Sequence, residues 1–530
     1  MPRVTERAAA ANRQIARSAG VVMIGLALSS LAGLASTILV SNAFGTSRQI
    51  DSFYAANRLT EILFNLMAGG ALASAFVPTF TGFLTRGDGR GAWRLASAVG
   101  NLVFLALSLV SALAALSGRW LVTTILAPGF TDPTQIALTV SLLRIMLLSS
   151  VIFGISGLIM GILNAQQHFA TPALAPACYR LGWIIGVIFL VPRWGIHGLA
   201  WGVVLGSSLH LVVQLPALIH QRGAYSFSLG HEQPAVREVA RLMAPRLLGV
   251  AVVQVNFLVN TLLASGMPEG SLTAITFGFT LMIMPQAVIA QATAIAALPT
   301  FSAQFARGEI ESLQDSLSNA LRGVLFLSLP ASLGLMILRR PIVSLILERG
   351  AFGAHSTELV AWALLWYAAG LVGHSLLEVL VRAFYAMHDT RTPVLVGAGA
   401  MSLNVVLSLT LAALFSRINW APHGGLALAN SLATAIEFLV LLRILQRRLR
   451  GLPLLRLGRP VGATLGASAA MGATLLAWLV GMAGQPAWLS AAGGVVLGMG
   501  IYAVAALALG APEVRRLPGL LLRRKAPPSD

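Results

Sequence analysis

The sequence predicts an all-α protein that crosses a membrane many times. Of its 530 residues, 57% are hydrophobic and only 10% are charged, whereas a soluble chain has about a quarter of its residues charged. Apolar stretches long enough to cross ~30 Å of hydrocarbon recur from end to end. They lack the alternating pattern of a membrane β-barrel. Because Cys178 is the only cysteine, the chain has no disulfide framework.

An internal repeat is the second observation. Shifting the chain by 221 residues aligns Ala75–Phe80 with Ala296–Phe301 and Thr171-Pro172 with Thr392-Pro393. The run beginning at Ile125 meets the run beginning at Ile346 at the same offset, and its last residue, Phe130, meets Phe352 one residue further on. Each match ends a long apolar run, so we infer that a unit of roughly 220 residues was duplicated, as in many transporters.

The apolar runs predict fourteen transmembrane helices. Their expected ranges are 20–42, 53–80, 95–117, 137–163, 172–192, 196–216, 246–265, 271–298, 318–338, 358–386, 393–416, 422–442, 461–482 and 487–510. The first twelve form two six-helix lobes, and the last two stand outside the repeat. The expected order is an N-terminus at 1–19, an N-lobe at 20–216, an inter-lobe connection at 217–245, a C-lobe at 246–442, a basic loop at 443–460, the last helix pair at 461–510 and a tail at 511–530.

The placement of positive charge gives the orientation. With both termini in the cytoplasm, most of the 36 Arg and Lys residues fall on the cytoplasmic side, as the positive-inside rule requires. The net charge of +18 therefore reflects topology and contact with anionic lipid head groups. We expect no nucleic-acid partner, because no basic face carries a readable motif.

Several motifs read together resemble one family. Ile162-Leu163-Asn164-Ala165 with Pro172, Leu126 to Phe130, Glu348 to Phe352, and Phe384-Tyr385 with Asp389 are similar to motifs of the MurJ/MviN lipid II flippases of the MOP exporter superfamily. The resemblance covers about residues 20 to 450. It implies fourteen helices in two lobes, with a cavity lined by helices one, two, seven and eight. It also implies a groove beside helices thirteen and fourteen that takes a polyprenyl tail.

The chain departs from this family where cavity charges are expected. The resemblance places arginines in helices one and two and an Asp-Arg pair in helix eight. The matching positions here are Ser30, Ser36, Phe64, Asn65, Phe279 and Thr280. Gly69 and Ile283 replace two acids, and Glu378 replaces a lysine. Arginine is a strong partner for pyrophosphate, and these arginines are replaced here. Two substrates therefore stay open: lipid II and a related envelope precursor.

Helix two retains a charged pair in its apolar run. A charge at this depth is costly unless it is paired or faces water, so it is a candidate functional group. Arg58 and Glu61 are three residues apart and share a helix face with Asn65. We predict that Arg58 binds a phosphate, with a structural ion pair as the alternative. Asp51 is expected to cap the start of the helix.

Further candidates lie in helices five and seven. Arg180 and Arg246 could meet a pyrophosphate that enters from the cytoplasm. Gln254 and Asn260 either face the cavity or form interhelical hydrogen bonds.

The second lobe carries its own charges. Glu378 and Arg382 are four residues apart in helix ten, and Glu437 is nearly alone in helix twelve. They are candidates for coupling to an ion or between the lobes, with a buried structural pair as the alternative for the first two. A lone carboxylate suits a proton or sodium ion.

The function class follows from these features. The sequence has no phosphate-binding glycine-lysine loop, no metal-ligand spacing and no catalytic constellation, so we expect a transporter and not an enzyme. The first hypothesis is a flippase in the bacterial cytoplasmic membrane for a polyprenyl-pyrophosphate-linked saccharide, with alternating access and no cofactor beyond a coupling ion. The alternatives are a cation-coupled exporter of amphipathic molecules and a transport-poor scaffold for envelope-synthesis enzymes.

Overall fold

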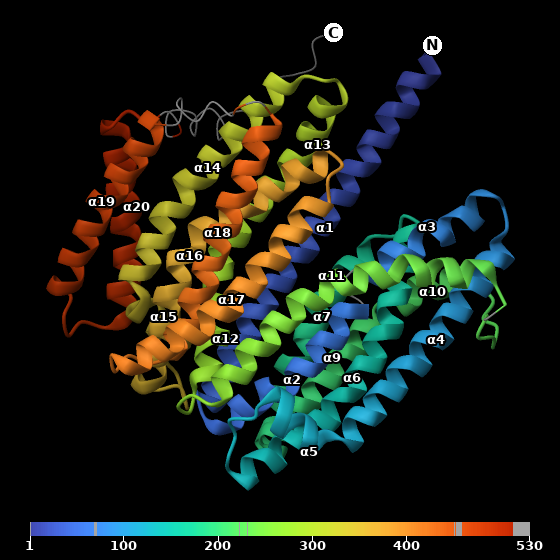
Figure 1. Cartoon of the computed structure of the whole chain (residues 1–530), viewed down its shortest axis with the longest axis horizontal. Helices are drawn as coiled ribbons and strands as arrows, with labels where there is room; N and C mark the ends of the chain where they lie inside the picture. The colour runs from blue at the N-terminus through green and yellow to red at the C-terminus, as the bar shows by residue number, and fades with distance from the viewer. Residues whose placement is uncertain are drawn as a thin grey trace. The chain divides into compact units, whose positions relative to one another are not determined.

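The computed structural model describes residues 2–67, 71–221, 223–230, 232–449, 451, 458–511 and 513, and all regular elements in these ranges are helices (Figure 1). The chain groups into two compact units, Met1–Leu272 and Thr273–Asp530. The predicted tail, apart from residues 511 and 513, and the predicted loop after Leu449, apart from residues 451 and 458–460, lie outside the described residues.

The first unit contains the helices from α1 to α11. They are α1 (Pro2–Phe44), α2 (Arg48–Met67), α3 (Ala71–Thr85), α4 (Gly89–Leu116), α5 (Gly118–Leu121), α6 (Pro133–Ala165), α7 (Ala170–Ile185), α8 (Val191–Trp194), α9 (Ile196–Val212), α10 (Leu215–His220) and α11 (Pro234–Ser265), with π-helical turns η1 (Val122–Leu126) and η2 (Gly186–Leu190). α2 packs on α6, and α1 packs on α7. α11, expected in the second lobe, makes its main contacts with α2 and α3.

The second unit contains most of α12 and the helices that follow. They are α12 (Ser271–Gln286), η3 (Ala287–Gln291), α13 (Ala292–Ala306), α14 (Ile310–Ile337), α15 (Arg339–Leu347), α16 (Ala354–Ala386), α17 (Arg391–Arg417), α18 (His423–Arg448), α19 (Gly458–Gly481), η5 (Leu489–Gly493) and α20 (Gly494–Ala508). α16 and α17 both pack on α18, and α14 packs on α16. A buried cluster that includes Phe301, Leu380 and Leu441 joins α13, α16 and α18.

The helix bounds confirm the internal repeat. α3, α4 and α6 of the first unit return 221 residues later as α13, α14 and α16, each with the same length and the same relative ends. The turns repeat as well: Gln167 and His388 follow α6 and α16 with φ of 62° and 59°. Such left-handed residues end a helix and redirect the chain. Pro78 and Pro299 occupy equivalent interior positions of α3 and α13.

The helices confirm a polytopic membrane fold close to the fourteen spans expected. Twelve described helices are long and apolar enough to cross a membrane, and α11, bent by 40° near residue 248, gives a thirteenth. Pro245 precedes the bend and removes a backbone donor from α11. The remaining expected span, 53–80, is divided between α2 and α3, and the charges of Asp51, Arg58 and Glu61 exclude α2 from that count.

Within the second unit, α19 and α20 pack on α14 through a cluster that includes Phe326, Met471 and Tyr502. The hydroxyl of Tyr502 donates a 2.6 Å hydrogen bond to the carbonyl of Phe326. Pro330, four residues after Phe326 in α14, has no N–H to offer this carbonyl. Tyr502 therefore supplies the donor that the proline removes. The expected lipid groove beside these helices stays a prediction.

Candidate functional site

The charged pair expected in helix two is formed and lies where α2 meets α11. Arg58 Nη1 donates a 2.7 Å hydrogen bond to Glu61 Oε2, and Arg58 Nε donates to Thr261 Oγ1 at 3.0 Å. The guanidinium carbon lies 5.5 Å from the centre of the Phe257 ring. Asn57 donates to the other oxygen of Glu61 at 2.9 Å. Arg58 is thus oriented by two helices.

This geometry leaves Arg58 available to an anion. Its side chain is 16% exposed and that of Glu61 is 41% exposed. A guanidinium has five N–H donors, and the hydrogen bonds to Glu61 and Thr261 use two of them. The remaining three, on a planar group held by Phe257, can approach two phosphate oxygens at once.

Sequence reasoning missed the partners of Arg58 on α11. Thr261 is 203 residues from Arg58 in the chain. Gln254, which was a candidate, lies two turns before Thr261 on the same face of α11, and this residue is 7% exposed. Asn260 is also buried, but it lies on a different face of α11.

Two other candidates have separate surroundings. Arg180 on α7 lies 5.4 Å from the Trp183 ring and 5.8 Å from the Tyr179 ring. Arg180 and Glu61 both lie within electrostatic range of Tyr179, so Arg180 borders the same region. Arg246 is exposed and lies fifteen residues before Thr261 on α11, which is about 22 Å along a helix. The structure does not bring Arg246 to Arg58.

Asn65 is half-buried on α2, and no hydrogen bond joins it to the Arg58 cluster within the described part of the chain. Two positions where the family's charged residues are replaced, Phe64 and Phe279, pack against other aromatic rings. Phe64 lies 4.4 Å from Phe153, and Phe279 lies 5.2 Å from Tyr367, measured between ring centres. Gly69 lies outside the described residues.

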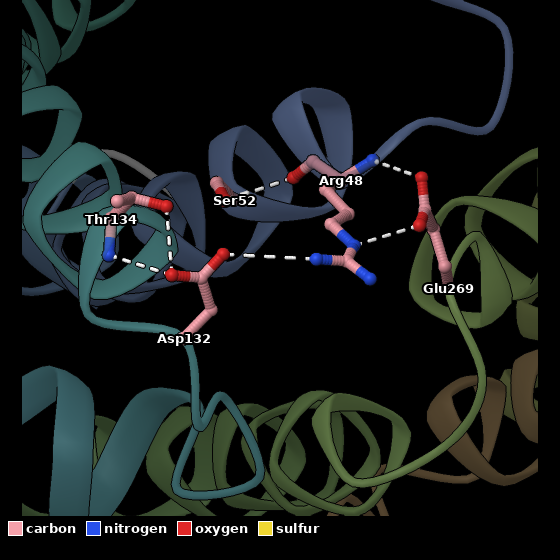
Figure 2. Close-up of polar contacts among 5 residues, drawn as sticks. All are labelled: Arg48, Ser52, Asp132, Thr134 and Glu269. Atoms are coloured by element: carbon pink, nitrogen blue, oxygen red, sulfur yellow. Dashed lines mark hydrogen bonds and ion pairs between the residues drawn. The ribbon is translucent and has the colours of Figure 1, made fainter.

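A second polar network holds the start of α2. The sequence prediction that Asp51 caps this helix was wrong. α2 begins at Arg48, so Asp51 lies in its first turn, and its carboxylate accepts a 2.7 Å hydrogen bond from the backbone N–H of Gly270. Figure 2 shows Arg48 between two carboxylates: its Nε lies 2.8 Å from Glu269 and its Nη1 lies 3.7 Å from Asp132. These contacts fasten the turn after α11 to the start of α2.

Asp132 also caps α6. Its carboxylate accepts hydrogen bonds from the backbone N–H and the hydroxyl of Thr134, at 2.9 and 2.8 Å. The hydrogen bonds from Thr134 are the main cause that lowers the pKa of Asp132, and Arg48 adds to them. Arg48, Asp132 and Glu269 are all at least a third exposed, so each ion pair contributes little to stability.

In the second unit, Glu378 and Arg382 form the expected pair with a separation of 3.6 Å, and both are about 30% exposed. Arg382 also lies 5.8 Å from the Tyr385 ring. Glu437 on α18 is 8% exposed and faces Gly397 on α17, where a Cβ atom would lie 3.1 Å from its Oε1. No ion pair joins Glu437 to Arg382 in the described ranges.

The family follows from comparison of the whole chain. A family model described as "Lipid II flippase MurJ" matches residues 40–492. The chain belongs to the MurJ family. "Lipid II flippase MurJ" of Burkholderia cenocepacia is 30% identical over 427 residues, 79% of this chain and 82% of that protein. "Probable lipid II flippase MurJ" of Rhizobium tropici is 28% identical over 517 residues, 95% and 96% of the two chains.

Solved structures agree on the fold. The structure titled "Lipid II flippase MurJ, inward closed conformation" matches with a TM-score of 0.80 and 23% identity, covering 94% of this chain and 99% of that one. An inward-facing MATE-family multidrug transporter of the MOP superfamily matches with a TM-score of 0.66 and 16% identity, covering 81% and 99%. This chain is therefore a multi-pass membrane protein with the MurJ fold, and MATE transporters have a related fold.

Proposed function

We propose that this chain moves lipid II, a polyprenyl-pyrophosphate-linked saccharide, across the bacterial cytoplasmic membrane. The observation that carries the proposal is Arg58, whose guanidinium is fixed by Thr261 and Glu61 in a helix of a MurJ-family chain. Within the described residues, three of its donors have no partner and can bind a ligand. Arg58 offers the fork geometry that a pyrophosphate requires. Membership of the MurJ family makes lipid II the first substrate to test.

In this proposal each group has a limited task. Arg58 binds the pyrophosphate while the polyprenyl tail stays in the bilayer, and the lobes then alternate their access. Glu61, which is 41% exposed, opposes the negative charge and so prevents the head group from being held too tightly. Arg180 borders the same region and adds positive charge near Glu61.

The coupling ion belongs to the proposal as well. Glu437 is the buried carboxylate in the second unit that suits a proton or a sodium ion. It faces the space left by Gly397. With both termini in the cytoplasm, as the charge distribution predicts, the membrane potential or an ion gradient would drive the cycle. Glu378 with Arg382 is a candidate for coupling within the second unit.

Rescue of a bacterium depleted of its own lipid II flippase tests the proposal. We expect the wild-type chain to restore growth and the Arg58→Ala variant, present at an equal level in the membrane, to fail. Loss of rescue by both proteins would contradict lipid II as the substrate.

A cation-coupled exporter of amphipathic small molecules is the second candidate. Glu437, buried and outside any ion pair with described residues, is the observation that favours it. An exporter would protect a drug-sensitive strain against amphipathic cations in a Glu437-dependent manner and would not rescue the depleted strain.

A further inference from the structure

The segment between α10 and α11 runs along α4 and exposes apolar side chains that a soluble protein would bury. We call residues 223–230 the strap. Ser226 and Ser228 are half-buried and their backbone groups contact α4, while the residues between and beside them are exposed: Tyr225 is 69% exposed, Phe227 is 89% exposed and Leu229 is 41% exposed. Alternation with period two is the mark of an extended segment. Here the apolar side faces outward.

α4 forms hydrogen bonds with the strap. The amide of Asn101 donates to the carbonyl of Ser228 at 2.9 Å, and the hydroxyl of Ser97 accepts from the backbone N–H of Ser226 at 3.1 Å. Tyr225 turns its hydroxyl back to Asn101, 2.7 Å away. Irregular backbone is tolerated at membrane depth only where protein groups satisfy it. The N–H of Ser226 and the carbonyl of Ser228 meet this condition.

The position along α4 places the strap at a membrane interface. α4 has 28 residues, about 42 Å, so it exceeds the ~30 Å of hydrocarbon by about 12 Å. Arg90 and Arg94 in its first two turns are exposed and identify the end that leaves the hydrocarbon. Ser97 and Asn101, which contact the strap, lie one to three helical turns after these arginines. The strap therefore extends from the head groups into the edge of the acyl chains.

A basic cavity lies beside the strap on the same end of α4. It has a volume of about 540 Å³ between α3, α4 and the start of α11, and Arg86, Arg94 and Glu238 are its charged lining residues. Neither arginine forms an ion pair with a described residue. Gln233 and Pro234, just after the strap, complete the wall. Two unpaired guanidinium groups against one carboxylate favour an anionic ligand.

We propose that this cavity and the strap together bind an anionic phospholipid from the leaflet that the topology predicts to be cytoplasmic. The phosphate head group lies at Arg86 and Arg94, and the acyl chains lie on Tyr225, Phe227 and Leu229. A lipid is the occupant because one molecule combines the charge that the arginines need with the apolar surface that the outward face of the strap needs. The proposal is independent of what the protein transports.

Fluorescence quenching by brominated lipids tests the site in the full-length protein. Cys178→Ala removes the native thiol, and Phe227→Cys is labelled with bimane and reconstituted in phosphatidylcholine vesicles. A small fraction of lipid is brominated, either as phosphatidylglycerol or as phosphatidylcholine. We expect both lipids to quench the label, with brominated phosphatidylglycerol enriched about five-fold per arginine, since a basic residue near the surface contributes about that factor.

Paired variants separate the charge effect from folding. Arg86→Gln with Arg94→Gln should bring the enrichment close to one while leaving quenching by brominated phosphatidylcholine unchanged, which shows that the strap is still in place. Arg119→Gln with Arg193→Gln, two exposed arginines of the same unit at the other predicted end, should keep the enrichment. A label that neither lipid quenches, equal quenching by both lipids, or an enrichment that survives loss of Arg86 and Arg94 would each overturn the proposal.

Discussion

Replacing Arg58 with lysine changes the shape of the cation in the α2–α11 site but keeps its charge. In the structure Arg58 spans Thr261 and Glu61 at 3.0 and 2.7 Å, and its other three donors form no hydrogen bond with the described residues. A lysine ammonium cannot hold the same two partners and also present a fork to a phosphate. Hydrogen bonds to charged groups contribute about 1.5–3 kcal/mol each. Loss of one such bond to the substrate lowers transport by about ten- to a hundred-fold.

Stability should change much less than transport. Glu61 is 41% exposed, so removal of its partner does not leave a fully buried charge, and half-exposed ion pairs contribute at most about 1 kcal/mol. We therefore expect Arg58→Lys and Arg58→Ala to keep a melting temperature within a few degrees of the wild type. Arg58→Ala should abolish flipping, and Glu61→Gln should reduce it less.

Arg144 on α6 provides the matched control. It is also an arginine in a spanning helix, and its Nε donates to the carbonyl of Ala115 at 3.0 Å. Arg144→Lys should flip lipid at the wild-type rate. Melting temperature and lipid flipping are measured on the same purified proteins. Normal flipping by Arg58→Ala, together with a lowered melting temperature in both Arg58 and Glu61 variants, would show that the pair is structural and would refute the reasoning.

Three further predictions concern the second unit. Glu437→Gln should leave the protein folded but remove the dependence of flipping on the ion gradient in vesicles, and an unchanged dependence would exclude Glu437 as the coupling group. Burial alone would raise the pKa of Asp389, but hydrogen bonds and a nearby arginine hold it at about 2. A depressed pKa stabilises the fold above the unfolded pKa of about 3.9. The melting temperature should therefore fall between pH 4 and 2, and it should fall less in Asp389→Asn. Tyr502→Phe should cost about 1 kcal/mol by leaving the Phe326 carbonyl without its donor. Adding Pro330→Ala to Tyr502→Phe restores a backbone N–H, so the two changes measured by thermal unfolding should not be additive.

The repeat and the local charge pair could be predicted from the sequence because both depend on short-range order. Apolar periodicity and an offset of 221 residues locate equivalent helices, and the bounds of α6 and α16 follow that offset. The spacing of Arg58 and Glu61 places them on one helix face, and their hydrogen bond follows. These features require no knowledge of which helices touch.

The partners of these residues could not be predicted in the same way. Thr261 reaches Arg58 across 203 residues, and Glu269 reaches Arg48 across 221, so only the packing of α11 on α2 brings them together. The wrong role for Asp51 has a similar cause. A carboxylate near a helix start suits a cap, yet the helix begins earlier and the backbone N–H of Gly270 is the donor.

Reconstitution of the purified protein with lipid II tests the central claim most directly. Lipid II with a labelled head group is placed in both leaflets of proteoliposomes, and the rate at which the inner pool becomes accessible to an external reagent is followed under an imposed membrane potential. The account predicts rapid transfer by the wild-type protein, transfer at the basal rate of empty vesicles by Arg58→Ala, and no competition from amphipathic cations. Basal transfer by the wild-type protein, with export of an amphipathic cation from the same vesicles, would contradict it.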